Sequence, residues 1–187
     1  MVANPSIRCI IRDGVEADIA RCQLLDHTYE TDQVLQIHIS QDDQIGWDID
    51  LKRERLPRKL ELSAPKSANR LRESLADHEA FLVAEQRLGG EMLGYLAMQN
   101  DQRHKIGLIH DFIVDRPQRR AQVGMKLLGA ARTWAKEQSL LRLTVEVQSK
   151  NTPVIAFFQA MGFVFCGFND RYFPNQDIAI FFSLSLR

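Results

Sequence analysis

A short basic turn between an apolar run and a helical pattern holds the residues best suited to bind phosphate oxygens. The apolar run, residues 108–114, is rich in β-branched side chains and is typical of a buried strand. A helical pattern begins at Val123, so its first N–H groups, which lack intrahelical partners and carry the positive end of the dipole, face the turn. Arg119 and Arg120 add positive charge, and Gly124 lets an oxygen approach the backbone. The pattern predicts a pyrophosphate site.

This turn fits neither of two common phosphate-binding motifs but resembles a third. It lacks the Gly-Lys-Ser/Thr ending of the P-loop and the three glycines of the dinucleotide fingerprint. Residues 119–124, RRAQVG, resemble the Arg/Gln-x-x-Gly-x-Gly/Ala signature of the GNAT family of N-acetyltransferases, with Gln122 in place of the first glycine. The resemblance continues in 143–151 and 156–163, in the family's order and spacing, and 172–182 is most similar to streptothricin acetyltransferases.

The resemblance implies that the chain uses acetyl-CoA (coenzyme A) as a co-substrate, with no metal. In the family, the turn holds the pyrophosphate, and the backbone at the end of the preceding strand pairs with the pantetheine arm as an added strand would. The residues assigned to the cofactor in this way are Phe112, Ile113, Val114, Arg119, Arg120, Ala121, Gln122, Val123, Gly124, Met125, Lys126, Asn151 and Phe158. Two simpler interpretations stay open: an ordinary turn with solvated arginines, and a role for Asn151 as a helix N-cap.

His110, Asp111 and Glu146 are candidates for removing the proton of an acceptor amine. Side chains alternate along a strand, so His110 is predicted to share a face with Phe112 and Val114, whereas Asp111 faces the other way. An imidazole titrates near neutral pH and suits a general base, and some members of the family present a histidine here. Asp111 and Glu146 match residues of streptothricin enzymes and could instead act as base or bind a cationic amine. For each candidate, a structural role stays open.

A proton donor for the departing thiolate is less clearly marked. Where the family usually has a tyrosine, the chain has Phe158, which carries no exchangeable proton. Tyr172 is the phenol available in the C-terminal region and is therefore the candidate acid. Because a thiolate is a good leaving group that water can protonate, the missing tyrosine does not exclude transfer.

The elements around these residues predict an α/β (α+β) fold with a mixed, mostly antiparallel sheet. Apolar runs and turns predict strands at 81–84, 92–97, 108–114 and 141–147, and a helix at 152–161 followed by a terminal strand pair. The resemblance implies that the sheet splays between its fourth and fifth core strands and carries helices on both faces.

The stretch before this core predicts an additional hairpin. Apolar and polar residues alternate at 35–40 and again at 47–52. The charged run at 52–59, which contains Pro57, is interpreted as a solvated loop. Residues 31–78 are assigned to an insertion on the acceptor side.

Length and charge indicate one globular domain with a small partner. The 187 residues are enough for one full-sized core, so 1–187 is assigned to a single N-acetyltransferase domain with its acetyl-CoA-binding core at 80–187. The 24 basic and 24 acidic residues balance, which argues against a nucleic-acid or anionic membrane surface. The three cysteines have no metal-site spacing, and no export signal or membrane span is recognisable, so a cytoplasmic protein is expected.

These features predict an acetyl-CoA-dependent N-acetyltransferase that transfers an acetyl group to a primary amine of a small molecule or peptide. The amine is expected to attack the thioester directly in a ternary complex. The sequence leaves open whether the protein forms a homodimer. Because Gln122 and Phe158 depart from the family pattern, a catalytically weak or inactive acyl-CoA-binding module of the same fold is the alternative. A purely structural domain would bind no CoA.

Overall fold

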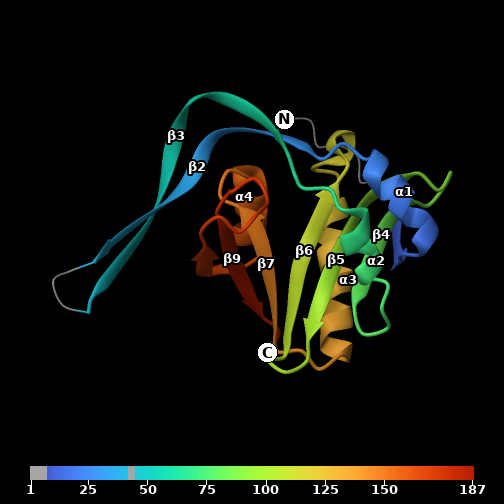
Figure 1. Ribbon diagram of the computed structural model, residues 1–187. Helices are drawn as coiled ribbons and strands as arrows, with labels where there is room; N and C mark the ends of the chain where they lie inside the picture. Colours follow the sequence, from blue (N-terminus) through green and yellow to red (C-terminus); the bar gives the residue numbers. More distant parts are fainter. Residues whose placement is uncertain (1–7, 42–44) are drawn as a thin grey trace. The chain divides into compact units, whose positions relative to one another are not determined.

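The computed structural model describes residues 8–41 and 45–187, which divide into two compact units (Figure 1). Unit 1 consists of the chain up to Thr28, Ser63–Glu146 and Ser183–Arg187. Unit 2 consists of Tyr29–Leu62 and Val147–Phe182.

Unit 1 is built on strands in the hydrogen-bonded order β1-β4-β5-β6-β7. The β1–β4, β4–β5 and β5–β6 pairs are antiparallel, and β6–β7 is parallel. The strands are β1 (Cys9–Asp13), β4 (Ala80–Gln86), β5 (Met92–Asp101), β6 (Ile106–Val114) and β7 (Arg142–Gln148). The predicted strands and the mixed, mostly antiparallel sheet are therefore confirmed.

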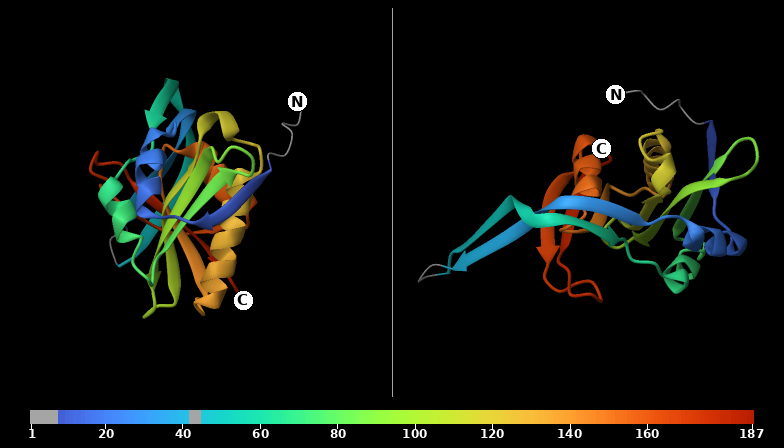
Figure 2. Two further views of the ribbon diagram at one scale, coloured as in Figure 1. Left: turned by 90° about the vertical axis from the view of Figure 1, so that its right-hand side faces the viewer. Right: turned by 90° about the horizontal axis from the view of Figure 1, so that it is seen from above.

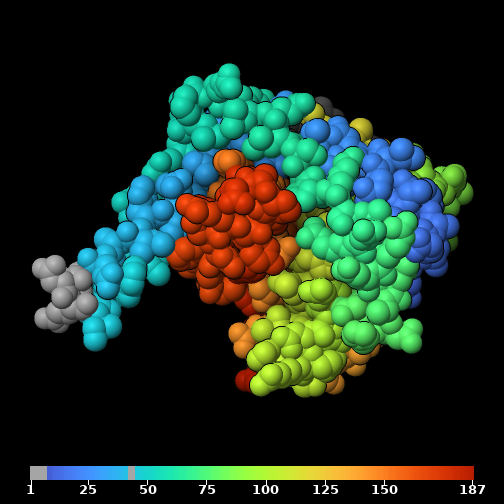
Figure 3. All heavy atoms as spheres, in the orientation of Figure 1, coloured from blue at the N-terminus to red at the C-terminus, as the bar shows by residue number. Residues whose placement is uncertain are grey.

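Helices cover both faces of this sheet. On one face, α1 (Glu16–Leu24) and α2 (Ala68–Glu73) lie side by side (Figures 1 and 3). On the other, α3 (Val123–Glu137) packs against β4, β5 and β6 (Figure 2). Between β6 and α3 lies a short 3-10 helix, Arg116–Gln118. None of the helices in the described part of the chain has the length and apolar character that crossing a bilayer takes.

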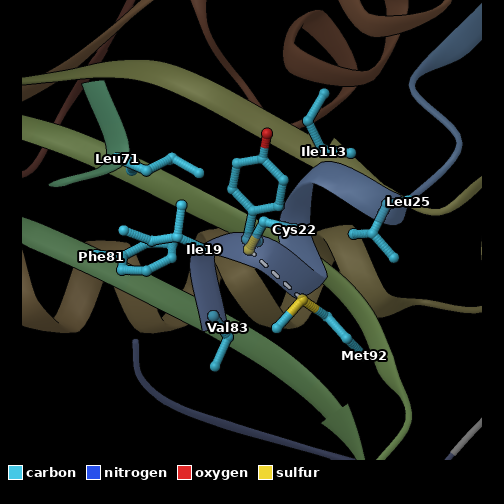
Figure 4. Close-up of a cluster of buried hydrophobic side chains, with 10 residues drawn as sticks. Ile19, Cys22, Leu25, Leu71, Phe81, Val83, Met92 and Ile113 are labelled. Carbon is cyan, nitrogen blue, oxygen red and sulfur yellow. Dashed lines mark hydrogen bonds between the residues drawn. The ribbon is translucent and has the colours of Figure 1, made fainter. Parts of the chain in front are cut away.

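A buried apolar cluster holds α1 and α2 on the sheet. Ile19 and Cys22 of α1 and Leu71 of α2 pack against Phe81 and Val83 of β4 (Figure 4). Burial raises the pKa of the Cys22 thiol to about 12, so this side chain behaves as a small protonated apolar group. The cluster fixes α2, which carries part of the candidate site, against the strands that carry the rest.

The parallel pair β6–β7 is described for the first half of β6. Its register runs from Ile106↔Arg142 to Ile109↔Val145, whereas β5 pairs with β6 as far as Val114. The splay between the fourth and fifth core strands is predicted for the half of β6 that follows.

Unit 2 contains a two-stranded ribbon, β2 (Thr28–Gln41) with β3 (Trp47–Ser63), as well as α4 (Thr152–Ala160), β8 (Val164–Asn169) and β9 (Ala179–Ser185) (Figure 2). The additional hairpin is confirmed. The prediction of a solvated loop at 52–59 was wrong, because β3 runs through these residues. A ribbon leaves each strand with one outer edge, where Pro57 needs no ladder partner, and charged side chains on both faces stay exposed.

Candidate active site

An irregularity in β6 places two candidate residues on the same side of the sheet. Ala97 of β5 is paired with Asp111, but the next residue, Met98, is paired with Ile109. His110 is thus an extra residue in β6, which makes a β-bulge and interrupts the alternation of side chains. The prediction that His110 and Asp111 face opposite ways, with His110 on the side of Phe112 and Val114, was therefore wrong.

The side chains of this bulge form a hydrogen-bonded chain with α2. The ring Nδ1 of His110 lies 2.9 Å from Oδ2 of Asp111, and its Nε2 lies 3.3 Å from Oγ of Ser74. Because a carboxylate only accepts, a neutral His110 carries its proton on Nδ1 and a lone pair on Nε2. The Ser74 hydroxyl also lies 3.1 Å from the Arg70 carbonyl oxygen, to which it can donate.

Arg70 of α2 connects this chain to β7. Its Nε and Nη2 donate to the two oxygens of Asp111 at 2.9 and 3.0 Å, and its Nη1 donates to Glu146 Oε1 at 3.4 Å. Nη2 also lies 3.3 Å from the carbonyl oxygen of His110. Although burial disfavours its charge, the neighbouring Asp111 carboxylate raises the pKa of Arg70 above its ordinary value. Arg70 therefore stays charged.

The cluster is closed to solvent except at the arginine. The side chains of His110, Asp111 and Glu146 are 4%, 4% and 3% exposed, whereas that of Arg70 is 27% exposed. Burial first, and then the charge of Asp111, raise the pKa of the nearby Tyr95 phenol well above its ordinary range. Tyr95 is therefore a neutral phenol at physiological pH. Over residues 8–41 and 45–187, no group of three or more His, Cys, Asp and Glu side chains could hold a metal ion.

Sequence reasoning missed Arg70 and Ser74. Ser67 caps α2 by accepting a hydrogen bond from the N–H of Arg70 at 3.2 Å. Arg70 and Ser74 are four residues apart, so they lie on one face of that helix. This spacing was the available signal. What it could not give was the face of the sheet against which that side of the helix would lie.

The predicted pyrophosphate turn has its basic side chains arranged differently from the expectation. The Arg119 guanidinium donates to three backbone carbonyls, those of Val114 at 3.0 Å, Thr28 at 2.6 Å and Asp26 at 3.1 Å. It therefore ties the turn to the end of α1 and to β6. The N–H groups of its guanidinium are directed at backbone carbonyl oxygens of the protein itself. Arg120 is exposed and adopts a positive φ of 65°.

The backbone of the same turn is wound in the left-handed region. Gln122, the N-cap of α3, has φ 68° and ψ 0° and makes no side-chain cap hydrogen bond. A left-handed residue before a helix disfavours a Cβ, which gives a physical reason for glycine at this place in the family signature. Ala121 and Val123 are each 1% exposed and anchor the turn in the core. Only their backbone can face a ligand.

The remaining predicted cofactor residues fall into two groups. In unit 1, Ile113 belongs to the buried cluster, Phe112, Val114, Gly124 and Lys126 are partly exposed, and Met125 is exposed. In unit 2, Asn151 caps α4 by accepting from the N–H of Val154 at 3.4 Å, and Phe158 is fully buried. Asn151 is thus a helix N-cap.

Tyr172, the candidate acid, also lies in unit 2. Its ring is 41% exposed and packs edge-on against Phe173 and Phe181, with centroid separations of 5.3 and 5.6 Å. Phe158 makes similar edge-on contacts with Phe157 and Phe163. Phe158, Phe163 and Phe173 are buried, so the aromatic contacts of unit 2 are mainly packing contacts.

The family of the chain follows from its sequence match. Residues 47–163 match the acetyltransferase (GNAT) family. The match spans more than half of the 187 residues, and the chain belongs to that family. The resemblance read from the sequence motifs is thereby confirmed. A comparison with curated protein sequences found no match.

Solved structures share the fold over nearly the whole chain. The crystal structure of nourseothricin acetyltransferase is similar with a TM-score of 0.80 and 21% identity, covering 96% of this chain and 99% of the other. A putative streptothricin acetyltransferase from Bacillus anthracis, in complex with acetyl coenzyme A, gives 0.76 and 22%, covering 95% and 99%. The ribosomal-protein-S18-alanine N-acetyltransferase from Escherichia coli gives 0.67 and 15%, covering 95% and 94%. At these identities the likeness concerns the fold.

Proposed function

We propose that this protein is an acetyl-CoA-dependent N-acetyltransferase that acts on a primary amine of a small molecule or peptide by direct attack in a ternary complex. The observation that carries the proposal is the construction of β6. Its bulge presents His110 beside Asp111, and its end leads into the turn before α3. One strand thus connects a candidate base with a candidate cofactor turn.

The cofactor would bind along the second half of β6 and at the start of α3. The backbone of Phe112–Val114, which in the family pairs with the pantetheine arm, is the segment that leads from the bulge to the turn before α3, and we assign the arm to it. The first N–H groups of α3 lack intrahelical partners and favour the oxygens of a pyrophosphate. Arg120 and Lys126 are the basic side chains placed to add charge, while Arg119 holds the turn.

The amine must lose a proton as it attacks the thioester carbonyl. His110 offers the Nε2 lone pair, and Asp111 stabilises the imidazolium that forms because it accepts the Nδ1 proton's hydrogen bond. Since the His110 side chain is 4% exposed, the proton reaches Nε2 through the Ser74 hydroxyl or a water molecule. The CoA thiolate leaves and takes its proton from water.

Acetyl transfer is tested by two measurements on the purified chain. Calorimetric titration with acetyl-CoA should give saturable binding, and release of free thiol over a panel of primary amines should identify acceptors. An inert analogue such as ethyl-CoA, which lacks the transferable acyl group, is the control for background thiol. If acetyl-CoA does not bind at all, the proposal is wrong.

An acyl-CoA-binding module without turnover is the second candidate, and two observations favour it. Phe158, at the position of the family's usual tyrosine, is buried and has no proton to give. Gln122 places a side chain where the turn adopts a left-handed conformation. Tight acetyl-CoA binding without thiol release for any amine would identify the module.

A further inference from the structure

We propose that Arg70 determines the charge of the acceptors that this enzyme accepts, because its guanidinium occupies the place that a substrate's second positive charge would take. The inference rests on the proposed amine acetylation and extends it to the class of amine. It concerns a residue on α2 that the sequence motifs do not mark, and every contact involved lies within unit 1.

The guanidinium is bound as a cationic ligand would be. Two of its nitrogens form a fork on the carboxylate of Asp111, at 2.9 and 3.0 Å, and a third reaches Glu146 at 3.4 Å. A fork of this kind is the strongest geometry for a guanidinium and a carboxylate. The main-chain oxygen of His110, 3.3 Å away, adds another acceptor. Arg70 therefore bridges the two carboxylates that sequence reasoning assigned to the acceptor amine.

Burial makes a cation at this place necessary. Asp111 and Glu146 are almost fully buried, and a buried carboxylate that loses its partner is costly. Arg70 is the more exposed partner in both ion pairs, at 27%, so it stands between the carboxylates and solvent. An incoming acceptor with a second cationic group must compete with this tethered guanidinium. An acceptor that carries its only positive charge on the reacting amine does not.

The native enzyme should accordingly prefer monocationic amines. The comparison that tests this uses butylamine and butane-1,4-diamine, which share a four-carbon chain and differ by one charge. We expect native kcat/KM to favour butylamine. In Arg70→Gln, which keeps a hydrogen-bond donor but removes the charge, the ratio should shift toward the diamine by roughly tenfold or more, as a charge-assisted contact predicts. The shift should come from KM of the diamine.

Arg72→Gln is the matched control on the same helix. Arg72 pairs with Glu16 at 2.9 Å, and both side chains are more than half exposed, so its charge lies outside the cluster. This variant should keep the native ratio. An unchanged ratio in a folded Arg70→Gln protein that still turns over would overturn the inference while leaving the proposed function intact.

A second measurement needs no turnover. Arg70→Ala opens the space of a guanidinium beside two carboxylates, so calorimetry with N-ethylguanidinium should show saturable binding to this variant and none to the native protein or to Arg72→Ala. Binding should disappear in Arg70→Ala with Asp111→Asn. Absence of binding to folded Arg70→Ala contradicts the inference. If that variant does not fold, the acceptor ratio of Arg70→Lys is measured instead. This variant keeps the positive charge and should retain the native ratio. Failure of acetyl-CoA binding in the native protein would instead refute the proposed function.

Discussion

At the scale of single side chains, His110 is held at both ring nitrogens. Asp111 binds Nδ1 and Ser74 faces Nε2, so the ring has one orientation and one tautomer. Two consequences follow for catalysis. The base is aligned before substrate arrives, and the carboxylate beside it contributes to the same proton transfer instead of competing for the role.

Substitution of either partner should therefore slow transfer. His110→Ala is expected to lower kcat by roughly 10²–10⁴-fold and to flatten the acid limb of the pH–rate profile. Asp111→Asn should also lower kcat, because the amide does not select the Nδ1–H tautomer or stabilise an imidazolium. Acetyl-CoA affinity should stay near native in both.

The control for these variants is His104→Ala. His104 is an exposed histidine paired with Asp101 at 2.6 Å, away from the site. It should leave rate and pH profile unchanged. If His110→Ala keeps the native pH–rate profile while Glu146→Gln loses its acid limb, Glu146 is the general base.

The left-handed conformation of Gln122 leads to a prediction about stability and acetyl-CoA binding. A residue with φ 68° carries a Cβ penalty that glycine lacks. Gln122→Gly should therefore raise the free energy of unfolding by up to about 1 kcal/mol, measured by urea titration, even though glycine is more flexible in the unfolded chain. It should also tighten acetyl-CoA binding, because a ligand oxygen can then approach the turn. Weaker binding in a stabler protein would show that the glutamine side chain contributes to the site.

At the scale of elements, the turn before α3 has separable structural and binding parts. Arg119 holds it through three carbonyl oxygens, so Arg119→Ala should destabilise the protein by about 1–3 kcal/mol and lower acetyl-CoA affinity as a consequence. Gly124→Glu should leave stability near native, since an acidic residue suits the first turn of a helix, yet weaken binding by roughly tenfold or more through repulsion of the pyrophosphate. Thermal melting and calorimetry on both variants separate these effects. An unchanged affinity in Gly124→Glu would remove the pyrophosphate from this turn.

The elements themselves could be predicted from sequence because each carries its own periodic signal. The strands at 92–97 and 108–114 and the helix after Gln122 have patterns that local physics is enough to explain. The bulge at His110 has no such signal. It depends on how β6 is registered against Ala97 and Met98 of a different strand, and alternation alone gave the wrong face.

The site was predictable to the extent that it lies on these elements. His110, Asp111 and Glu146 were found, and the structure brings them together around Arg70. Arg70 was missed because a charged residue on a short helix is usually solvated. Only the packing of α2 against the sheet, through Leu71 and its neighbours, makes Arg70 the partner of two buried carboxylates.

At the scale of the whole chain, a second charged cluster contributes to stability. Arg12 of β1 donates to Asp18 at 2.6 Å and to Glu85 at 2.8 Å, and Arg21 contacts the same two carboxylates. These hydrogen bonds, above all those from Arg12, hold the pKa values of Asp18 and Glu85 below their ordinary values. Both groups are thus more acidic in the folded than in the unfolded chain.

The stability that these two carboxylates contribute should consequently be lost in the acid range. As pH drops below about 4.5, the unfolded chain takes up protons before the folded one does, so stability that is complete at neutral pH is lost progressively toward the lower folded pKa values. Arg12→Ala should lower the free energy of unfolding at pH 7 and make its decline below pH ~4.5 shallower. Urea titrations at a series of pH values measure this. An equally steep decline in the variant would assign acid sensitivity to other carboxylates.

The bulge in β6 also predicts what deletion of one residue from this strand would do. His110 is one residue more than the ladder with β5 requires, so a chain lacking it would pair Met98 and Ala97 with consecutive residues, as an uninterrupted sheet does. Deleting this residue should improve the regularity of the strand and at the same time remove the base. The chemistry proposed here thus depends on one residue that the ladder with β5 leaves unmatched, and a variant of this chain without it would present a single acidic side chain in place of the histidine–aspartate pair.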